Sequence, residues 1–157
     1  MDFAQSAHGV DMIAGPITDS ELWDFAADWY RKLDVHAPIA EILPGLADLE
    51  LEMRFPEATE HGHAGFSAWY HRVIRIFFDE EHTLKEARII EDGPLPKAKV
   101  IVNWQARIWH PQEAKSKWLG FDAHQTWILR RAPDDGRLQV VTYIVDDLKP
   151  MPGSDPL

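Results

Sequence analysis

His61 and His63, two positions apart, are the most compact pair of side chains in the sequence that could do chemistry. Imidazoles at this spacing can bind a transition metal, but two ligands make only half of a four-coordinate site. The chain has no cysteine, which excludes thiolate ligands, thiolate nucleophiles and disulfides. No obvious third ligand follows, so the pattern favours a solvated loop at a helix start. We therefore expect no metal and no cofactor.

Aromatic side chains form a second group of candidate functional residues. Seven Trp and seven Phe exceed what close packing of a small core requires. Large, stiff rings suit a ligand cavity or an interface, although each is also an ordinary core residue. The candidate ligand-binding residues are Met53, Phe55, Trp69, Trp104, Trp127 and Tyr143.

The segment Val100 to Trp109 must position part of this group. Apolar residues alternate along it over ten positions, which predicts a long strand. Val100, Val102 and Trp104 fall on one face, which reads as core. The other face mixes Ile101, Asn103, Gln105 and Trp109, which is too polar for a core and too apolar for open solvent. A strand of this kind is expected in the middle of a sheet.

The remaining elements follow in a simple order. Thr18 to Glu21 predicts a capping box before an amphipathic first helix, and Pro38 opens a short second helix. Leu49 to Phe55 alternates as a strand, and a third helix is expected to run as far as Phe77 and end at Asp79–Glu81. Four strands follow, expected at residues 82–90, 98–109, 121–130 and 138–145. Helices segregated from an antiparallel sheet indicate an α+β fold with the helices on one face.

Length and charge limit the class of protein. A chain of 157 residues predicts one domain, with a core at about 18–147, a flexible arm at 1–16 and an irregular tail at 148–157. A formal net charge of -10 disfavours nucleic acid and anionic membrane surfaces as partners. The first residues lack a signal-peptide pattern, and no apolar run is long enough to span a bilayer. A cytoplasmic protein is the expectation.

This order of elements resembles the nuclear transport factor 2-like superfamily, and its SnoaL-like branch in particular. The resemblance rests on the Gly62 to Tyr70 segment opening the third helix, the strand led by His82 and the strand bearing Trp104. It implies a cystatin-like α+β cone, in which a curved sheet wraps around three helices from the N-terminal half. It also implies an apolar, cone-shaped pocket and an outer sheet face that often pairs with a second subunit.

Three kinds of active site in the superfamily can be compared with this chain. Isomerase-like members carry a base at the end of the first strand, where this chain has Phe55 before Pro56. Hydrolase-like members use an Asp-Arg-Asp relay inside the cone. The matching residues Arg107, Asp122 and Asp146 are expected outside it, because Arg107 lies on the face opposite Trp104.

Dehydratase-like members pair a Tyr on the first helix with a His after the third, and Tyr30 and His82 match these positions. A neutral imidazole can take a proton near pH 7, and a phenol can polarise a leaving oxygen. The acid or amide that usually completes the set on the central strand is replaced by Ile108. Both residues could also be structural. If they lie in one cavity, we expect them to bond each other, a water or a ligand.

The expected function is therefore that of a small-molecule pocket protein. If it is catalytic, we expect a cofactor-independent lyase or isomerase of the dehydratase type acting on a hydrophobic oxygenated ligand. The alternative is a non-catalytic ligand-binding or dimerisation module. In either case we expect a hydrophobic small molecule as partner and a homodimer formed through the outer sheet face, where Ile101, Asn103, Gln105 and Trp109 offer a self-complementary patch.

Overall fold

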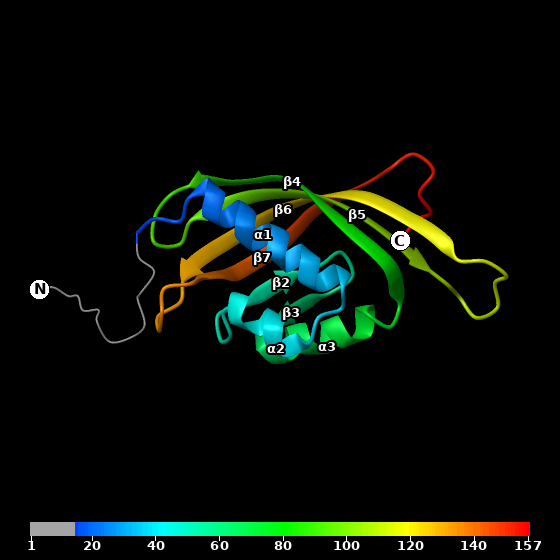
Figure 1. Cartoon of the computed structure of the whole chain (residues 1–157), viewed down its shortest axis with the longest axis horizontal. Coiled ribbons are helices and arrows are strands. Elements are labelled where there is room, and N and C mark those ends of the chain that lie inside the picture. The colour runs from blue at the N-terminus through cyan, green and yellow to red at the C-terminus, as the bar shows by residue number, and fades with distance from the viewer. Residues whose placement is uncertain (1–14) are drawn as a thin grey trace, which may run out of the picture.

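Four long strands form most of a curved, open sheet in the computed structural model, which describes residues 15–157 (Figure 1). They are β4 (Phe77–Glu91), β5 (Lys97–Ile108), β6 (Lys117–Arg131) and β7 (Leu138–Pro150). Each is antiparallel to the next, as predicted from the alternating pattern. The predicted arm at 1–16 lies almost wholly outside the described residues.

Two short strands extend the sheet beyond β7. They are β2 (Glu52–Arg54) and β3 (Thr59–His61), and the full order is β3-β2-β7-β6-β5-β4. Of the strand expected at Leu49 to Phe55, only Glu52–Arg54 is a strand, and it joins the same sheet. Its pairing is parallel, however, because Met53 lies opposite Tyr143 on β7 in a parallel register. The sheet is therefore mixed rather than wholly antiparallel.

Three helices cover the concave side of the sheet, which confirms the α+β class (Figure 1). α1 (Asp19–Asp34) lies across β4, and α2 (Ile39–Ile42) continues into the 3-10 turn η1 (Leu43–Gly45). α3 (Gly62–Val73) follows β3. Thr18 caps α1 by accepting the N–H of Glu21 at 3.1 Å, as expected. The Glu21 carboxylate does not close a capping box, because it pairs with Arg131 at the β6–β7 hairpin.

Several expected boundaries were wrong. α3 ends at Val73, and Phe77, which was placed on the helix stripe, is the first residue of β4. Asp79 and Glu80 are therefore strand residues. β7 continues to Pro150, so the irregular tail begins at Met151 rather than at residue 148. β5 is the second strand from the sheet edge, and β6 and β7 occupy the middle.

The core lies between the helices and the concave face. Leu22, Ala26 and Trp29 of α1 and Phe66 of α3 pack against Val100, Trp127 and their neighbours on the sheet. The strand alternation explains this, since every second residue of β5 from Ala98 to Val102 is buried. The opposite, convex face carries the polar members of the same strands.

Candidate functional site

A cavity of about 640 Å³ opens between the concave sheet face, the end of α1 and the end of α3. Its walls are mainly apolar and aromatic, including Phe77, Val102, Phe121, Ala123, Val145 and Leu148. A volume of this size suits a small organic molecule. A second hollow of about 320 Å³ lies beside α1, but its cations Lys32 and Arg137 are each paired with nearby aspartates. The larger cavity is the better candidate site.

Six of the eight predicted site residues line this cavity. They are Tyr30, Phe55, Trp69, His82, Trp104 and Tyr143. Phe55 and Trp69 stack face to face with ring centroids 3.8 Å apart, so that part of the wall is already packed. Met53 and Trp127, by contrast, are fully buried in the core and do not line the cavity. They lie behind the wall, where β2, β6 and β7 meet.

Tyr30 and His82 stack on one another with ring centroids 4.7 Å apart and an interplanar angle of 23°. Both residues lie on one cavity wall with Trp104, whereas Trp127 lies behind it. They were also expected to bond each other, a water or a ligand. Instead, each is held by other protein groups.

His82 is held by Asp34, the last residue of α1. Nδ1 of His82 lies 2.5 Å from Asp34 Oδ1, and the backbone N–H of His82 donates to Asp34 Oδ2 at 2.9 Å. Because a carboxylate only accepts hydrogen bonds, the proton of a neutral His82 must lie on Nδ1. Nε2 then keeps its lone pair, on a residue that lines the cavity. This is the arrangement that a general base requires.

Tyr30 ends a chain of buried hydrogen bonds. The indole N–H of Trp127 donates to Gln125 Oε1 at 3.1 Å, which orients the amide so that Gln125 Nε2 donates to the Tyr30 hydroxyl at 2.8 Å. The hydroxyls of Tyr30 and Tyr143 lie 3.1 Å apart. These two hydroxyls carry two protons but share one hydrogen bond. One of the two phenolic protons is used in this hydrogen bond. The other has no acceptor among residues 15–157, so it is available to a ligand oxygen.

Burial keeps both phenols in the protonated form. It raises the pKa of Tyr143 to about 12, and it raises the pKa of Tyr30 well above its ordinary value, with the nearby Tyr143 adding to the effect. At neutral pH the pair is thus a hydrogen-bond donor. Burial therefore disfavours a phenolate nucleophile or base at this position.

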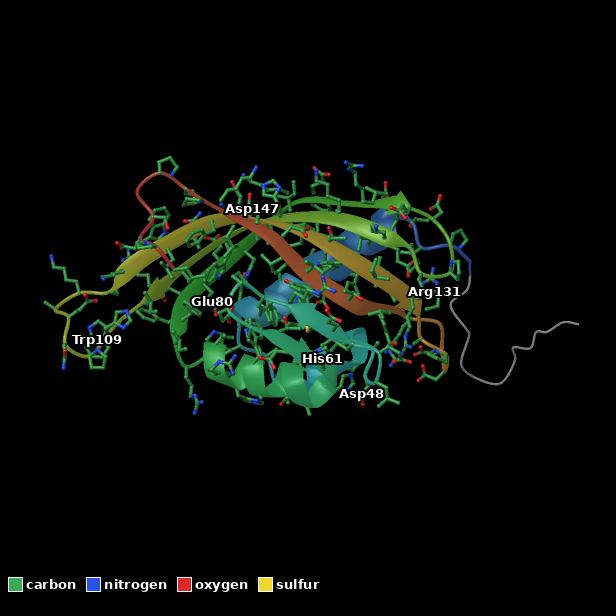
Figure 2. All side chains as sticks on the ribbon, turned by 180° about the vertical axis from the view of Figure 1, so that it is seen from behind. Asp48, His61, Glu80, Trp109, Arg131 and Asp147 are labelled. Atoms are coloured by element: carbon green, nitrogen blue, oxygen red, sulfur yellow. The ribbon has the colours of Figure 1, made fainter. Side chains whose placement is uncertain are left out.

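The carboxylate Glu80 also lines the cavity, and it lies on the same strand as His82. Its Oε2 lies 2.8 Å from His36 Nε2, and its Oε1 accepts the Trp104 indole N–H at 3.1 Å. Figure 2 places Glu80 on β4 where that strand curves towards α3. Asp34, Glu80 and Gln125 were all missed from the sequence. Gln125 left a signal as an amide on the otherwise apolar face of β6, and Asp34 left one as an acid at the C-terminus of α1.

The other chemical arrangements considered from the sequence do not assemble. Arg107, Asp122 and Asp146 do not line the cavity, and Asp122 instead bonds Asn103 and Lys85. His63 bonds the backbone oxygen of Leu46. Within residues 15–157, no group of three or more metal-binding side chains is present. In the same residues, no helix has both the length and the apolar character needed to cross a membrane.

Solved structures share this architecture. A protein of the nuclear transport factor 2-like superfamily from Salmonella enterica superposes with a TM-score of 0.64, at 13% identity, covering 88% of this chain and 92% of that one. The chain has the nuclear transport factor 2-like fold. The resemblance inferred from the sequence is thus confirmed at the level of the fold.

Other neighbours with this fold carry different names. A candidate scytalone dehydratase from Novosphingobium aromaticivorans has a TM-score of 0.61 and 14% identity, over 88% of this chain and 87% of its own. A candidate aromatic ring hydroxylase from the same organism has a TM-score of 0.69 and 13% identity, over 85% and 93%. No family model matches the sequence, and no curated protein matches it. At these identities the nuclear transport factor 2-like fold is shared, whereas the activity has to be argued from the site.

Proposed function

We propose that the cavity binds a hydrophobic, oxygen-bearing small molecule and catalyses a cofactor-independent elimination or isomerisation of the dehydratase type. The observation that supports this most directly is the stacking of the Asp34-held imidazole of His82 on Tyr30, whose hydroxyl pair with Tyr143 has one free donor. A base and an oxygen-polarising acid are thus adjacent in a mainly apolar cavity.

In an elimination, the free phenolic proton hydrogen-bonds a carbonyl oxygen of the ligand, and His82 Nε2 takes the proton from the adjacent carbon. The electron pair of the broken C–H bond becomes the C=C bond as the neighbouring C–O bond breaks. The protonated imidazole returns its proton to the leaving hydroxyl, which departs as water. In an isomerisation no C–O bond breaks. The electron pair of the C–H bond is held in an enolate whose oxygen accepts the phenolic hydrogen bond, and the protonated imidazole returns its proton to a different carbon.

Proton abstraction can be tested without the natural substrate. 2-Tetralone is a hydrophobic ketone whose C1 protons exchange slowly in D₂O, and NMR follows the exchange directly. We expect the protein to accelerate exchange, His82→Gln to lose about 10²–10⁴-fold of that acceleration, and Tyr143→Phe to lose a smaller part. His71→Gln, on the outside of α3, is the matched control and should behave as the unmodified protein.

Exchange that is no faster than in buffer would contradict a catalytic role and favour the alternative, a non-catalytic ligand-binding module. The apolar aromatic wall supports that alternative, since binding alone needs no base. As part of either proposal we place the protein in the cytoplasm, where chains without disulfides are common.

A further inference from the structure

Strand β4 contains a bulge at the point where it enters the cavity. Phe78 lies opposite Arg107 of β5 and Glu81 lies opposite Gln105, so β4 has one residue more than its partner over this stretch. Asp79 sits in the bulge with a φ of 50°. The extra residue shifts the alternation, so that Phe77, Glu80 and His82 all line the cavity. In a regular strand that points Phe77 inward, Glu80 would face outward.

A second residue with a left-handed backbone, His36, forms a hydrogen bond with the Glu80 side chain. His36, two residues beyond α1, also has a φ of 50°, and its Nε2 lies 2.8 Å from Glu80 Oε2. Within residues 15–157, His36 and Asp79 are the two non-glycine residues in the left-handed region. Both left-handed residues are thus at the His36–Glu80 hydrogen bond: His36 is one partner, and Asp79 directly precedes the other. Backbone strain concentrated in this way is a feature of functional sites.

The Glu80 carboxylate has capacity left for a ligand. Its side chain is 10% exposed and receives one hydrogen bond at each oxygen, from His36 and from Trp104. A carboxylate offers about four acceptor positions, so about two remain. A glutamine could satisfy both protein partners without the cost of burying a charge. Holding Trp104 and His36 in place does not, by itself, call for a carboxylate.

We propose that Glu80 is a ligand-contacting residue that selects for an O–H or N–H donor on the bound molecule and against an anionic group. The proposal rests on the proposed function only in taking the same cavity as the binding site. The charged side chains of the cavity wall agree with this proposal. Glu57 and Glu80 are acidic. Among residues 15–157, Arg72 is the one Arg or Lys that lines the cavity, and its charge is paired with Glu60 at 3.6 Å. Glu80 and His82 are two residues apart on one strand, roughly 6.6–6.8 Å along it. The ligand's donor therefore lies close to the carbon that faces His82.

Three probes with one aromatic skeleton test this by isothermal titration calorimetry: 1-naphthylmethanol, its methyl ether and 1-naphthylacetate. For the unmodified protein we expect the alcohol to bind at least 5-fold more tightly than the ether, and the anion to bind most weakly. Glu80→Gln should narrow the ratio of alcohol to anion affinity at least 5-fold, because a charge-assisted acceptor and a repulsive charge are both lost. Glu81→Gln, one residue on and exposed on the outer face, is the matched control and should leave the ratio unchanged.

The ranking of the three probes by the unmodified protein is informative even if Glu80→Gln does not fold. Equal affinities, or tightest binding of the anion, would overturn the role of Glu80 while leaving the cavity's proposed function in place. An unchanged ratio in a folded Glu80→Gln variant would overturn it in the same way. Failure of all three probes to bind would overturn both proposals.

Discussion

Asp34 binds both the side chain and the backbone of His82, one with each carboxylate oxygen, at 2.5 Å and 2.9 Å. The acid is the last residue of α1, and the histidine lies on β4. The contact thus joins the helix to the strand at the position of the candidate base, and it fixes the orientation and the tautomer of the imidazole together.

Asp34→Asn should therefore affect both stability and tautomer. Hydrogen bonds to charged groups contribute about 1.5–3 kcal/mol, so we expect a loss of that order in the free energy of unfolding, measured with urea. Nitrogen-15 NMR of the imidazole should show Nδ1–H as the dominant neutral tautomer only in the unmodified protein. Asp28→Asn, on the exposed side of the same helix, should cost much less. An unchanged tautomer in Asp34→Asn would contradict the role assigned to Asp34.

The three tyrosines predict how stability responds to alkaline pH. Burial raises the pKa of Tyr30, of Tyr70 and of Tyr143, the last to about 12, above the ordinary value of 10.0. Their contribution to stability is complete below about pH 10 and is lost as the pH rises towards the folded-state pKa values. Tyrosinate absorbance at 295 nm should therefore rise only above pH 10, together with the loss of the near-ultraviolet circular dichroism signal. A phenol that titrates at 10 in the folded protein would contradict the burial of that residue.

The hydrogen-bonded pair His36 and Glu80 should show measurable coupling in the free energy of unfolding. A double-mutant cycle with His36→Asn and Glu80→Gln is expected to give an interaction energy of about 0.5–3 kcal/mol, because the two side chains share a hydrogen bond. Asn also tolerates the left-handed conformation, so the backbone at position 36 is little changed.

The bulge residue beside this pair serves as a control for strain alone. Asp79→Gly removes no side-chain contact of Glu80 and relieves a φ of 50°, so it should leave the melting temperature unchanged or slightly raised. A marked loss of stability in Asp79→Gly would mean that the Asp79 side chain itself holds the bulge.

We propose that the convex sheet face forms a homodimer. Ile101 and Gln105 are half-buried there, although Asn103 is occupied within the chain by Asp122 and Gln105. Sedimentation at micromolar concentration should give twice the monomer mass of 18.0 kDa. Ile101→Asp should yield a folded monomer, whereas Leu95→Asp, in the exposed β4–β5 turn, should remain dimeric. A monomeric unmodified protein would exclude this interface.

The strands were predictable because their alternation is local. Val100, Val102 and Ala106 lie on the buried face of β5 as their spacing indicates, and Gly136 has the positive φ of 78° expected in the β6–β7 turn. The boundary between α3 and β4 was not predictable in this way. The run from Phe66 to Phe77 fits a helical stripe, whereas in the structure the helix ends at Val73 and Phe77 and Phe78 pair with β5.

This error explains why Glu80 was missed from the candidate site. Glu80 was taken as the end of a helix, so no sheet face could be assigned to it. Asp34 sits at the C-terminus of α1, where a negative charge is unfavourable, and that was the available sign that it has a partner. Tyr30 and His82 were found because the fold resemblance supplied their roles, which periodicity alone does not reveal.

The parallel pairing of β2 with β7 has a consequence for how the chain folds. Met53 lies opposite Tyr143, and between them come α3 and three of the four long strands. This pairing closes a long loop, and contacts so distant in sequence slow folding. During synthesis, the apolar faces of α1 and α3 have no complete sheet to cover until β7 has left the ribosome. Over that interval the nascent chain exposes aromatic surface, so we expect it to aggregate more readily than a helical bundle of equal length.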